Sequence, residues 1–322
     1  MREGYSKMRK SVKVLALAVM IASLVAGAAS AVTFVNIATG STGGSYYPLG
    51  GGMAKIWNDN IEGINASAQS TGGTVNNIQL MGSKEADAAF MDGLYYYAYL
   101  GKGKFEGNAQ DYIRALVPLY PEPTQLMVAK NSGIKSLKDF KGKRVSIGAV
   151  ASGTEVTARQ LLKAAGIDPD KDIKAENLGV GDTATAFSDK RIDAAIMVGS
   201  LGMAGVIEAT TLGVVEFIDV PDSIRDKVIQ ETPYWVPFTI PANFYSNQPN
   251  EVKTYASWNI VAVHKDLDAD IVYQMTKTLF EHRDDLLAVR ATMQTMIPEN
   301  IKYILVPLHY GARKYYDEVL KK

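Results

Sequence analysis

Short runs rich in apolar and β-branched residues alternate with helical stretches along most of the chain. This alternation is typical of an α/β fold with mostly parallel strands. One order of elements occurs twice: a strand, a loop rich in glycine and hydroxyl groups, a helix, and then another strand, loop and helix. The predicted strands are residues 34–38 and 64–69 in the first unit and residues 144–148 and 173–178 in the second.

The ends of the two units resemble each other closely. The segment KEADAAFM, from Lys84 to Met91, aligns with KRIDAAIM, from Lys190 to Met197. Two units of the same plan predict two α/β lobes, in each of which helices begin directly after strands.

Two proline-rich segments are candidates for the connections between the lobes. Residues 115–130 form a strand-like run that three prolines interrupt, and residues 219–241 are again rich in proline. Two connections make the second lobe an insertion in the first. We therefore predict lobe I from residues 32–120 and 236–322, and lobe II from residues 121–235.

The C-terminal third supports this return to lobe I. Residues 256–267 form a strand-like run. Residues 268–289 predict one amphipathic helix, because their apolar residues recur at steps of three and four.

The first 31 residues have the features of a secretory signal peptide. Five basic residues precede an apolar run of 14 residues, and Ala29-Ser30-Ala31 offers a cleavage site. The run is shorter than the roughly 20 residues that span a membrane comfortably, and an uncleaved N-terminal anchor is the alternative. Because the sequence has no cysteine, a lipoprotein anchor and disulfides are excluded. We therefore predict a periplasmic protein that is not a lipoprotein.

The charge balance excludes one class of partner. Five of the 34 basic residues and one of the 34 acidic residues lie in the first 31 positions, which leaves 29 basic and 33 acidic residues. A net charge of about −4 gives no basic face for nucleic acid. We predict no nucleic-acid partner.

Four corners, at which a strand passes into a helix, carry the candidate chemistry. The first turn of a helix has backbone N–H groups without partners and the positive end of the helix dipole, so such corners bind anions. In an open α/β sheet, ligands bind outside the carboxyl ends of the strands, where both lobes would face a shared cleft. The corners are residues 41–46, 70–74, 152–155 and 181–183.

Asp92 follows the apolar run of Ala88 to Met91 and should lie at the cleft end of a strand. Its carboxylate could bind an ammonium or hydroxyl group of a ligand, or it could cap the next helix. The corresponding residue of the second unit is Val198, so the fold itself does not require an acid there.

Other chemistries find little support in the sequence. Neither glycine-rich loop has the spacing of a phosphate-binding motif. We predict no metal and no cofactor, since there is no cysteine and no metal-ligand spacing. A hydrolase that uses Ser152 is an open alternative, although Ser152 lacks the usual nucleophile motif and the three histidines are far apart in sequence.

Five segments together resemble the substrate-binding proteins of TRAP transporters in the TAXI class. These segments are IATGSTGGSYYPLGGGMAKIW, SKEADAAFMDG, SLKDFKGKRVSIGAVASGTEVTARQLLKAAGI, KRIDAAIMVG and PLHYGARKYYDEV. The resemblance implies a two-lobed fold of the type II periplasmic-binding-protein kind. It also implies that the protein closes on a small organic acid or amino acid and delivers it to a membrane permease driven by an ion gradient.

The sequence departs from that family at two functional positions. The family commonly has Gln two places before the Asp of the DG pair, where this chain has Phe90, and Ser-Gly-Ser with Glu-Asn in the second corner, where this chain has STGGTVNN. These differences predict a less acidic second corner and a more apolar pocket. Tyr310 replaces a usual proline, which concerns structure more than ligand binding.

We predict a monomeric binding protein whose ligand carries a carboxylate, and whose partners are the ligand and the permease subunits. A sensor that presents its ligand to a membrane receptor is a second possibility that sequence does not separate from the first. The predicted ligand-binding residues are Ser41, Gly44, Ser45, Tyr46, Thr71, Gly72, Thr74 and Asp92 from lobe I and Ser152, Gly153 and Thr154 from lobe II.

Overall fold

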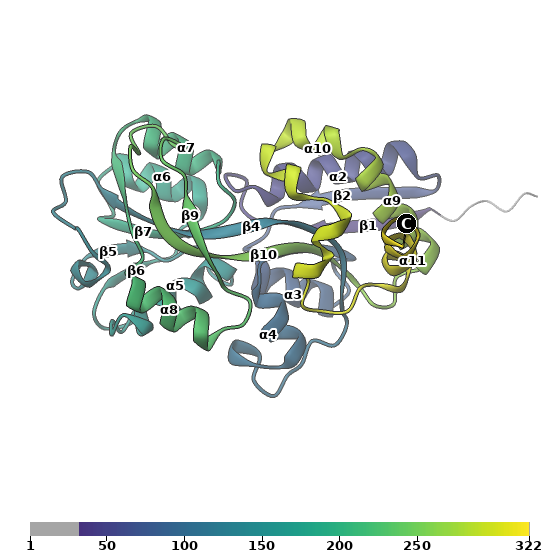
Figure 1. The fold of residues 1–322 in the computed structure, drawn as a ribbon, viewed down its shortest axis with the longest axis horizontal. Coiled ribbons are helices and arrows are strands. Elements are labelled where there is room, and N and C mark those ends of the chain that lie inside the picture. The colour runs from purple at the N-terminus through teal and green to yellow at the C-terminus, as the bar shows by residue number, and fades with distance from the viewer. Residues whose placement is uncertain (1–31, 322) are drawn as a thin grey trace, which may run out of the picture.

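The computed structural model describes residues 32–321, so the predicted signal peptide lies outside the described residues. The described chain forms two α/β halves with helices on both faces of their sheets (Figure 1). We call the half that contains Thr33 and Leu320 lobe I and the other half lobe II.

Lobe I is built on the first unit of the repeat. Its strand β1 pairs in parallel with β2 and with β3, so the carboxyl ends of these strands meet at one edge. The elements of this unit are β1 (Thr33–Ala38), α2 (Tyr46–Asn60), β2 (Ile64–Gln69), α3 (Thr74–Gly82), β3 (Ala88–Met91), α4 (Leu94–Leu100) and the 3-10 helix η1 (Gly103–Phe105).

Lobe II repeats that plan, with β5 pairing in parallel with β6 and β7. Its elements are η2 (Leu137–Phe140), β5 (Arg144–Ser146), α5 (Gly153–Ala164), β6 (Lys174–Glu176), α6 (Val180–Ser188), β7 (Ala194–Val198), α7 (Ala204–Thr211), β8 (Val215–Ile218), α8 (Asp222–Glu231) and β9 (Val236–Ile240). The predicted duplication is therefore confirmed.

The duplication extends to individual hydrogen bonds. In lobe I the backbone N–H of Asn36 donates to the carboxylate of Asp87 at 2.9 Å. In lobe II the backbone N–H of Arg144 donates to the carboxylate of Asp193, also at 2.9 Å. Each aspartate precedes the third strand of its unit and joins it to the first, which explains why the two DAA segments are alike.

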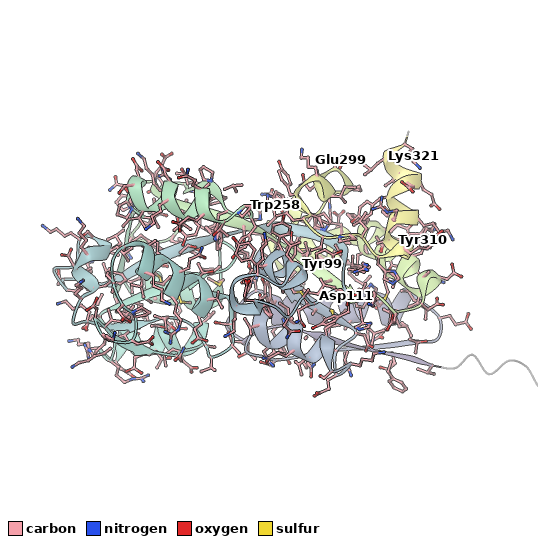
Figure 2. All side chains as sticks on the ribbon, turned by 90° about the horizontal axis from the view of Figure 1, so that it is seen from below. Tyr99, Asp111, Trp258, Glu299, Tyr310 and Lys321 are labelled. Carbon is pink, nitrogen blue, oxygen red and sulfur yellow. The ribbon has the colours of Figure 1, made fainter. Side chains whose placement is uncertain are left out.

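Two long antiparallel strands, β4 (Ile113–Ala129) and β10 (Val252–His264), join the lobes (Figure 1). From Ile113 to Pro123, β4 pairs with β10; from Thr124 onward it pairs with β7 of lobe II. Trp258, labelled near the middle of the molecule in Figure 2, lies on β10 opposite Pro121 and stacks on Tyr303 at 4.3 Å. The predicted connection at residues 115–130 corresponds to β4.

The second connection lies later in the chain than the proline content suggested. Strand β9 pairs with residues 252–256 of β10, and Ile240 and Val252 are buried in one cluster with Met127 and Met197 of lobe II. The division of the chain at residue 236 stays a prediction. This packing favours a crossing within β10 instead.

The C-terminal segment returns to lobe I as short helices. The elements are α9 (Ala269–Glu281), α10 (Arg283–Val289), η3 (Ala291–Thr295), η4 (Pro298–Tyr303) and α11 (Tyr310–Leu320). The single helix predicted at residues 268–289 is wrong, because His282 leaves helical geometry, with φ −109° and ψ 27°, and separates α9 from α10. Within residues 32–321, no helix has the length and apolar character to cross a membrane.

Asn77 of α3 ties together the strand ends beneath the first lobe's corners. It is fully buried, and its side-chain N–H₂ group donates to the backbone carbonyls of Thr39 and Phe90, each at 2.7 Å. Its carbonyl oxygen accepts a hydrogen bond from the Thr71 hydroxyl at 2.6 Å. One amide thus fixes β1, β3 and the second corner relative to one another.

Replacing Asn77 with alanine should lower the free energy of unfolding. The variant would remove the hydrogen bonds of Asn77 to two buried carbonyl groups and one hydroxyl, and each buried group that finds no other partner costs about 1–3 kcal/mol. Urea unfolding of both proteins measures the loss. The matched control is Asn60→Ala, because Asn60 is exposed and donates only to its own helix at Ile56. Equal midpoints for the two variants would contradict this role of Asn77.

Candidate ligand-binding site

A cavity lies between the lobes, at the carboxyl ends of both sets of parallel strands. Its interior leaves about 80 Å³ for the centres of water-sized molecules. The structure brings together all of the sequence-predicted site residues except Thr71. The predicted residues that line the cavity are Ser41, Gly44, Ser45, Tyr46, Gly72, Thr74, Asp92, Ser152, Gly153 and Thr154.

Thr71 is not among the lining residues. Its hydroxyl donates to Asn77 at 2.6 Å and accepts a hydrogen bond from the backbone N–H of Gly73 at 3.1 Å. Thr71 therefore shapes the loop before α3, and we no longer include it among the groups that contact a ligand.

The first corner presents the N-terminus of α2 to the cavity. Ser45 precedes the helix but does not cap it; its Oγ lies 2.5 Å from the Oγ of Ser200 in lobe II. Tyr46 begins the helix and packs on the buried ring of Phe90, with centroids 5.0 Å apart. Phe90, one of the departures from the TAXI pattern, thus acts on the cavity through Tyr46, since Phe90 itself does not line it.

The corner of lobe II presents the N-terminus of α5. Ser152 caps this helix, since its Oγ accepts a hydrogen bond from the Glu155 N–H at 3.0 Å. Gly153 lies against Asp92 from the other lobe: a Cβ added at Gly153 would overlap the Asp92 carboxylate. Only glycine allows the acid of lobe I to approach this helix so closely.

The structure shows Asp92 as a helix cap and also places it in the cavity wall, where a ligand group could reach it. Its Oδ1 accepts a hydrogen bond from the Leu94 N–H at 3.0 Å, at the start of α4. Its other oxygen lies beside Gly153 in the cavity wall. The cap therefore occupies one oxygen and leaves the second at the cavity.

Glu122 of β4 is a second acid in the cavity wall, which the sequence reasoning missed. It is only 3 % exposed, and its Oε2 accepts a hydrogen bond from the Tyr46 hydroxyl at 2.7 Å. A charged residue between Pro121 and Pro123, directly after the largely apolar residues 115–121, is the signal that could have identified it.

Burial changes the titration of both acids. It raises the pKa of Asp92 to about 6, although the hydrogen bonds from Leu94 and with Thr74 lower that pKa in part. Burial, together with the negative charge of Asp92, raises the pKa of Glu122 to about 8. Burial and the nearby Glu122 carboxyl also raise the pKa of Tyr46. Each shift favours the uncharged form, because desolvation penalises the ion.

Lobe II also contributes an apolar wall that the sequence reasoning did not identify. These residues lie at the end of β7 or in the segments after β6 and β7, and their apolar side chains agree with the predicted apolar pocket. They are Leu178, Val180, Met197, Val198 and Met203.

The lining residues, all within the described range 32–321, include no arginine, lysine or histidine. An anionic ligand would thus find only neutral donors here. A hydrolase that uses Ser152 is also poorly supported, because no histidine lines the cavity with Ser152 and the Ser152 hydroxyl already caps α5.

The two lobes touch around the cavity. The Asn76 N–H donates to the carbonyl of Ala151 at 3.0 Å, and Arg290 donates to the carbonyl of Gly202 at 3.2 Å. A Cβ added at Gly43 would lie 2.7 Å from the backbone nitrogen of Gly181. These contacts define a closed arrangement of the cleft.

Comparisons with known proteins agree with this architecture. The model of the NMT1-like family matches residues 37–319, and the chain belongs to that family. MatC of Rhodopseudomonas palustris, described with bound malate, has 15% identity and a TM-score of 0.55, over 89% of this chain and 97% of MatC.

Two further solved structures are similar. A protein of Bordetella bronchiseptica RB50 has 17% identity and a TM-score of 0.52, over 89% of this chain and 80% of its own. A Streptococcus mutans structure is described under glutathione import via GshT and the cystine ABC importer TcyBC. It has 15% identity and a TM-score of 0.50, over 81% of this chain and 94% of its own. These likenesses confirm the predicted fold class, the two-lobed type II periplasmic-binding-protein fold.

The raised pKa of Glu122 predicts a pH dependence of stability. Between its ordinary value near 4.5 and about 8, Glu122 keeps its proton in the folded protein and loses it in the unfolded chain. Stability therefore falls as the pH rises through this window, by at most about 1.4 kcal/mol per pH unit.

The variant Glu122→Gln should not lose stability in this way as the pH rises, since glutamine does not titrate and still accepts the Tyr46 hydrogen bond. Urea unfolding at pH 6, 7 and 8 measures the difference between the two proteins. Asp92 does not obscure the comparison, because its pKa of about 6 lies at the lower end of the range. If both proteins changed in parallel, the assignment of the raised pKa to Glu122 would be wrong.

Proposed function

We propose that this protein is a periplasmic solute-binding protein of a TRAP-type transporter of the TAXI class. In this proposal it captures a small carboxylate-bearing solute between its lobes and delivers it, as a monomer, to the membrane permease. The observation that carries the proposal is that predicted residues from both lobes line one interlobe cavity. This convergence places hydrogen-bond donors of both lobes where one solute could contact them.

Recognition of the carboxylate rests on the helix N-termini in this proposal. Helices α2 and α5, of 15 and 12 residues, begin at the cavity from opposite lobes. Their first-turn N–H groups and the hydroxyls of Ser41 and Thr154 are neutral donors suited to an anion. MatC, which has the same fold, is described with a bound carboxylate.

Closure would couple binding to delivery. A solute that contacts both helix starts favours the closed arrangement by the difference between its affinities for the closed and open forms. The permease would then distinguish loaded from empty protein by the relative position of the lobes.

The first test is ligand binding by the mature chain, residues 32–322. Native mass spectrometry with amino acids, dicarboxylates and keto acids should reveal a one-to-one complex. A solute at 100 times its dissociation constant adds about 2.7 kcal/mol of stability, which a thermal-shift assay detects. Absence of binding across the whole panel would refute the proposed function.

The second test asks whether binding needs closure. Gly43 does not line the cavity, yet a Cβ there would meet Gly181 of the other lobe. Overpacking of this kind costs about 1–3 kcal/mol, so Gly43→Ala should weaken binding on the order of 5- to 150-fold without lowering the stability of the ligand-free protein.

Calorimetric titration with the solute found by the first test measures this effect. The matched control is Gly51→Ala, because a Cβ at Gly51 meets no atom within 4 Å. An unchanged dissociation constant in Gly43→Ala would show that the closed contact is not part of the bound state.

A further inference from the structure

The two acids of the cavity wall each have one oxygen without a hydrogen bond. Asp92 uses Oδ1 to accept from Leu94, and Glu122 uses Oε2 to accept from Tyr46. Among residues 32–321, no hydrogen bond of ordinary geometry reaches Asp92 Oδ2 or Glu122 Oε1. The side chains of Thr74 and Asn259 lie close enough to lower the pKa values of Asp92 and Glu122, respectively, but neither carries a charge. Both side chains are at least nine-tenths buried, at 5 % and 3 % exposure, and both line the cavity.

Such an arrangement is costly unless something compensates the charge. A buried carboxylate without a positive partner is destabilised by several kcal/mol. The described cavity wall contains no basic residue. Arg290 is not a lining residue, and its guanidinium donates to the carbonyl of Gly202.

We propose that Asp92 and Glu122 together bind one cationic group of the solute, so that the cavity selects a small zwitterion over an anion of the same carbon skeleton. This inference rests on the proposed function, because it assumes that the cavity is the solute site. The ammonium group would lie between the two free oxygens. The carboxylate of the same molecule would lie at the helix starts of α2 and α5.

The cavity suits a small solute. It leaves about 80 Å³ for the centres of water-sized molecules.

Binding of a cation should displace a proton from the site. The groups that face Glu122 are the Tyr46 hydroxyl of α2, the Asp92 carboxylate after β3, Tyr120 on its own strand and the Asn259 amide of β10. None of them is positive, so Glu122 of the free protein holds its proton at neutral pH. An ammonium ion stabilises the carboxylate and releases that proton.

The test compares solutes that differ only in the amino group. The probes are alanine, lactate and pyruvate, serine and glycerate, and the larger set of glutamate, 2-hydroxyglutarate and 2-oxoglutarate. Calorimetric titration at pH 6, 7 and 8 gives each dissociation constant. Alanine or serine should bind at least tenfold more tightly than its hydroxy or keto analogue. Because binding releases a proton, the dissociation constant of the amino acid should fall as the pH rises, by up to tenfold per pH unit.

Two variants locate the effect in the acids. Asp92→Asn and Glu122→Gln keep an oxygen for Leu94 and Tyr46, and each should weaken amino-acid binding on the order of tenfold or more. Glu122→Gln should also abolish proton release, measured in two buffers of different ionisation enthalpy. The matched control Asp182→Asn removes an exposed acid near the cleft and should change neither quantity.

The outcomes separate this inference from the proposed function. Equal or tighter binding of lactate or pyruvate, strengthened at low pH, would overturn the cationic subsite and leave a carboxylate-binding protein. If no probe bound and the wider panel also failed, the proposed function itself would be wrong.

Discussion

The antiparallel pairing of β4 with β10 is the interaction on which the rest of the structure depends. Both strands run through both lobes, so their shared ladder is what holds the two repeats in one molecule. Prolines at 121 and 123 lie where β4 changes partner from β10 to β7. Proline removes a ladder hydrogen bond, so a strand can bend at this point at less cost than elsewhere. The connection is continuous and yet locally weak, as a hinge requires.

The sequence predicted much of the fold because the duplication repeats its hydrogen bonds as well as its pattern. In each unit an aspartate directly before the third strand, Asp87 or Asp193, accepts a hydrogen bond from the backbone of the first strand. The point at which the chain crosses from lobe II back to lobe I was harder to predict. Residues 236–256 pack on lobe II through long-range contacts to Met127 and Met197, which leave no local pattern. Likewise, the break at His282 interrupts an amphipathic pattern that continues across it.

The candidate site was predictable where it depends on helix starts and unpredictable where it depends on a strand. Serine, threonine and glycine directly after a strand indicate the start of a helix, so Ser45 and Ser152 could be placed from the sequence alone. No local pattern marks Glu122 as a site residue, because it lies within the segment that joins the lobes and its partner Tyr46 is 76 residues away. Only the folded arrangement brings this acid to the carboxyl ends of the parallel strands.

The glycines at the lobe contact and the buried acids have opposite effects on closure. Gly43 and Gly153 let backbone from one lobe approach the other without steric cost, which favours a closed cleft. Asp92 and Glu122 oppose it, because closure removes water from two carboxyl groups that have no positive partner among the lining residues. In the open cleft water would solvate these groups; in the closed cleft either protons or a bound cation must neutralise them. A ligand that supplies the cation therefore removes the main electrostatic cost of closure, which would make closure selective for the loaded state.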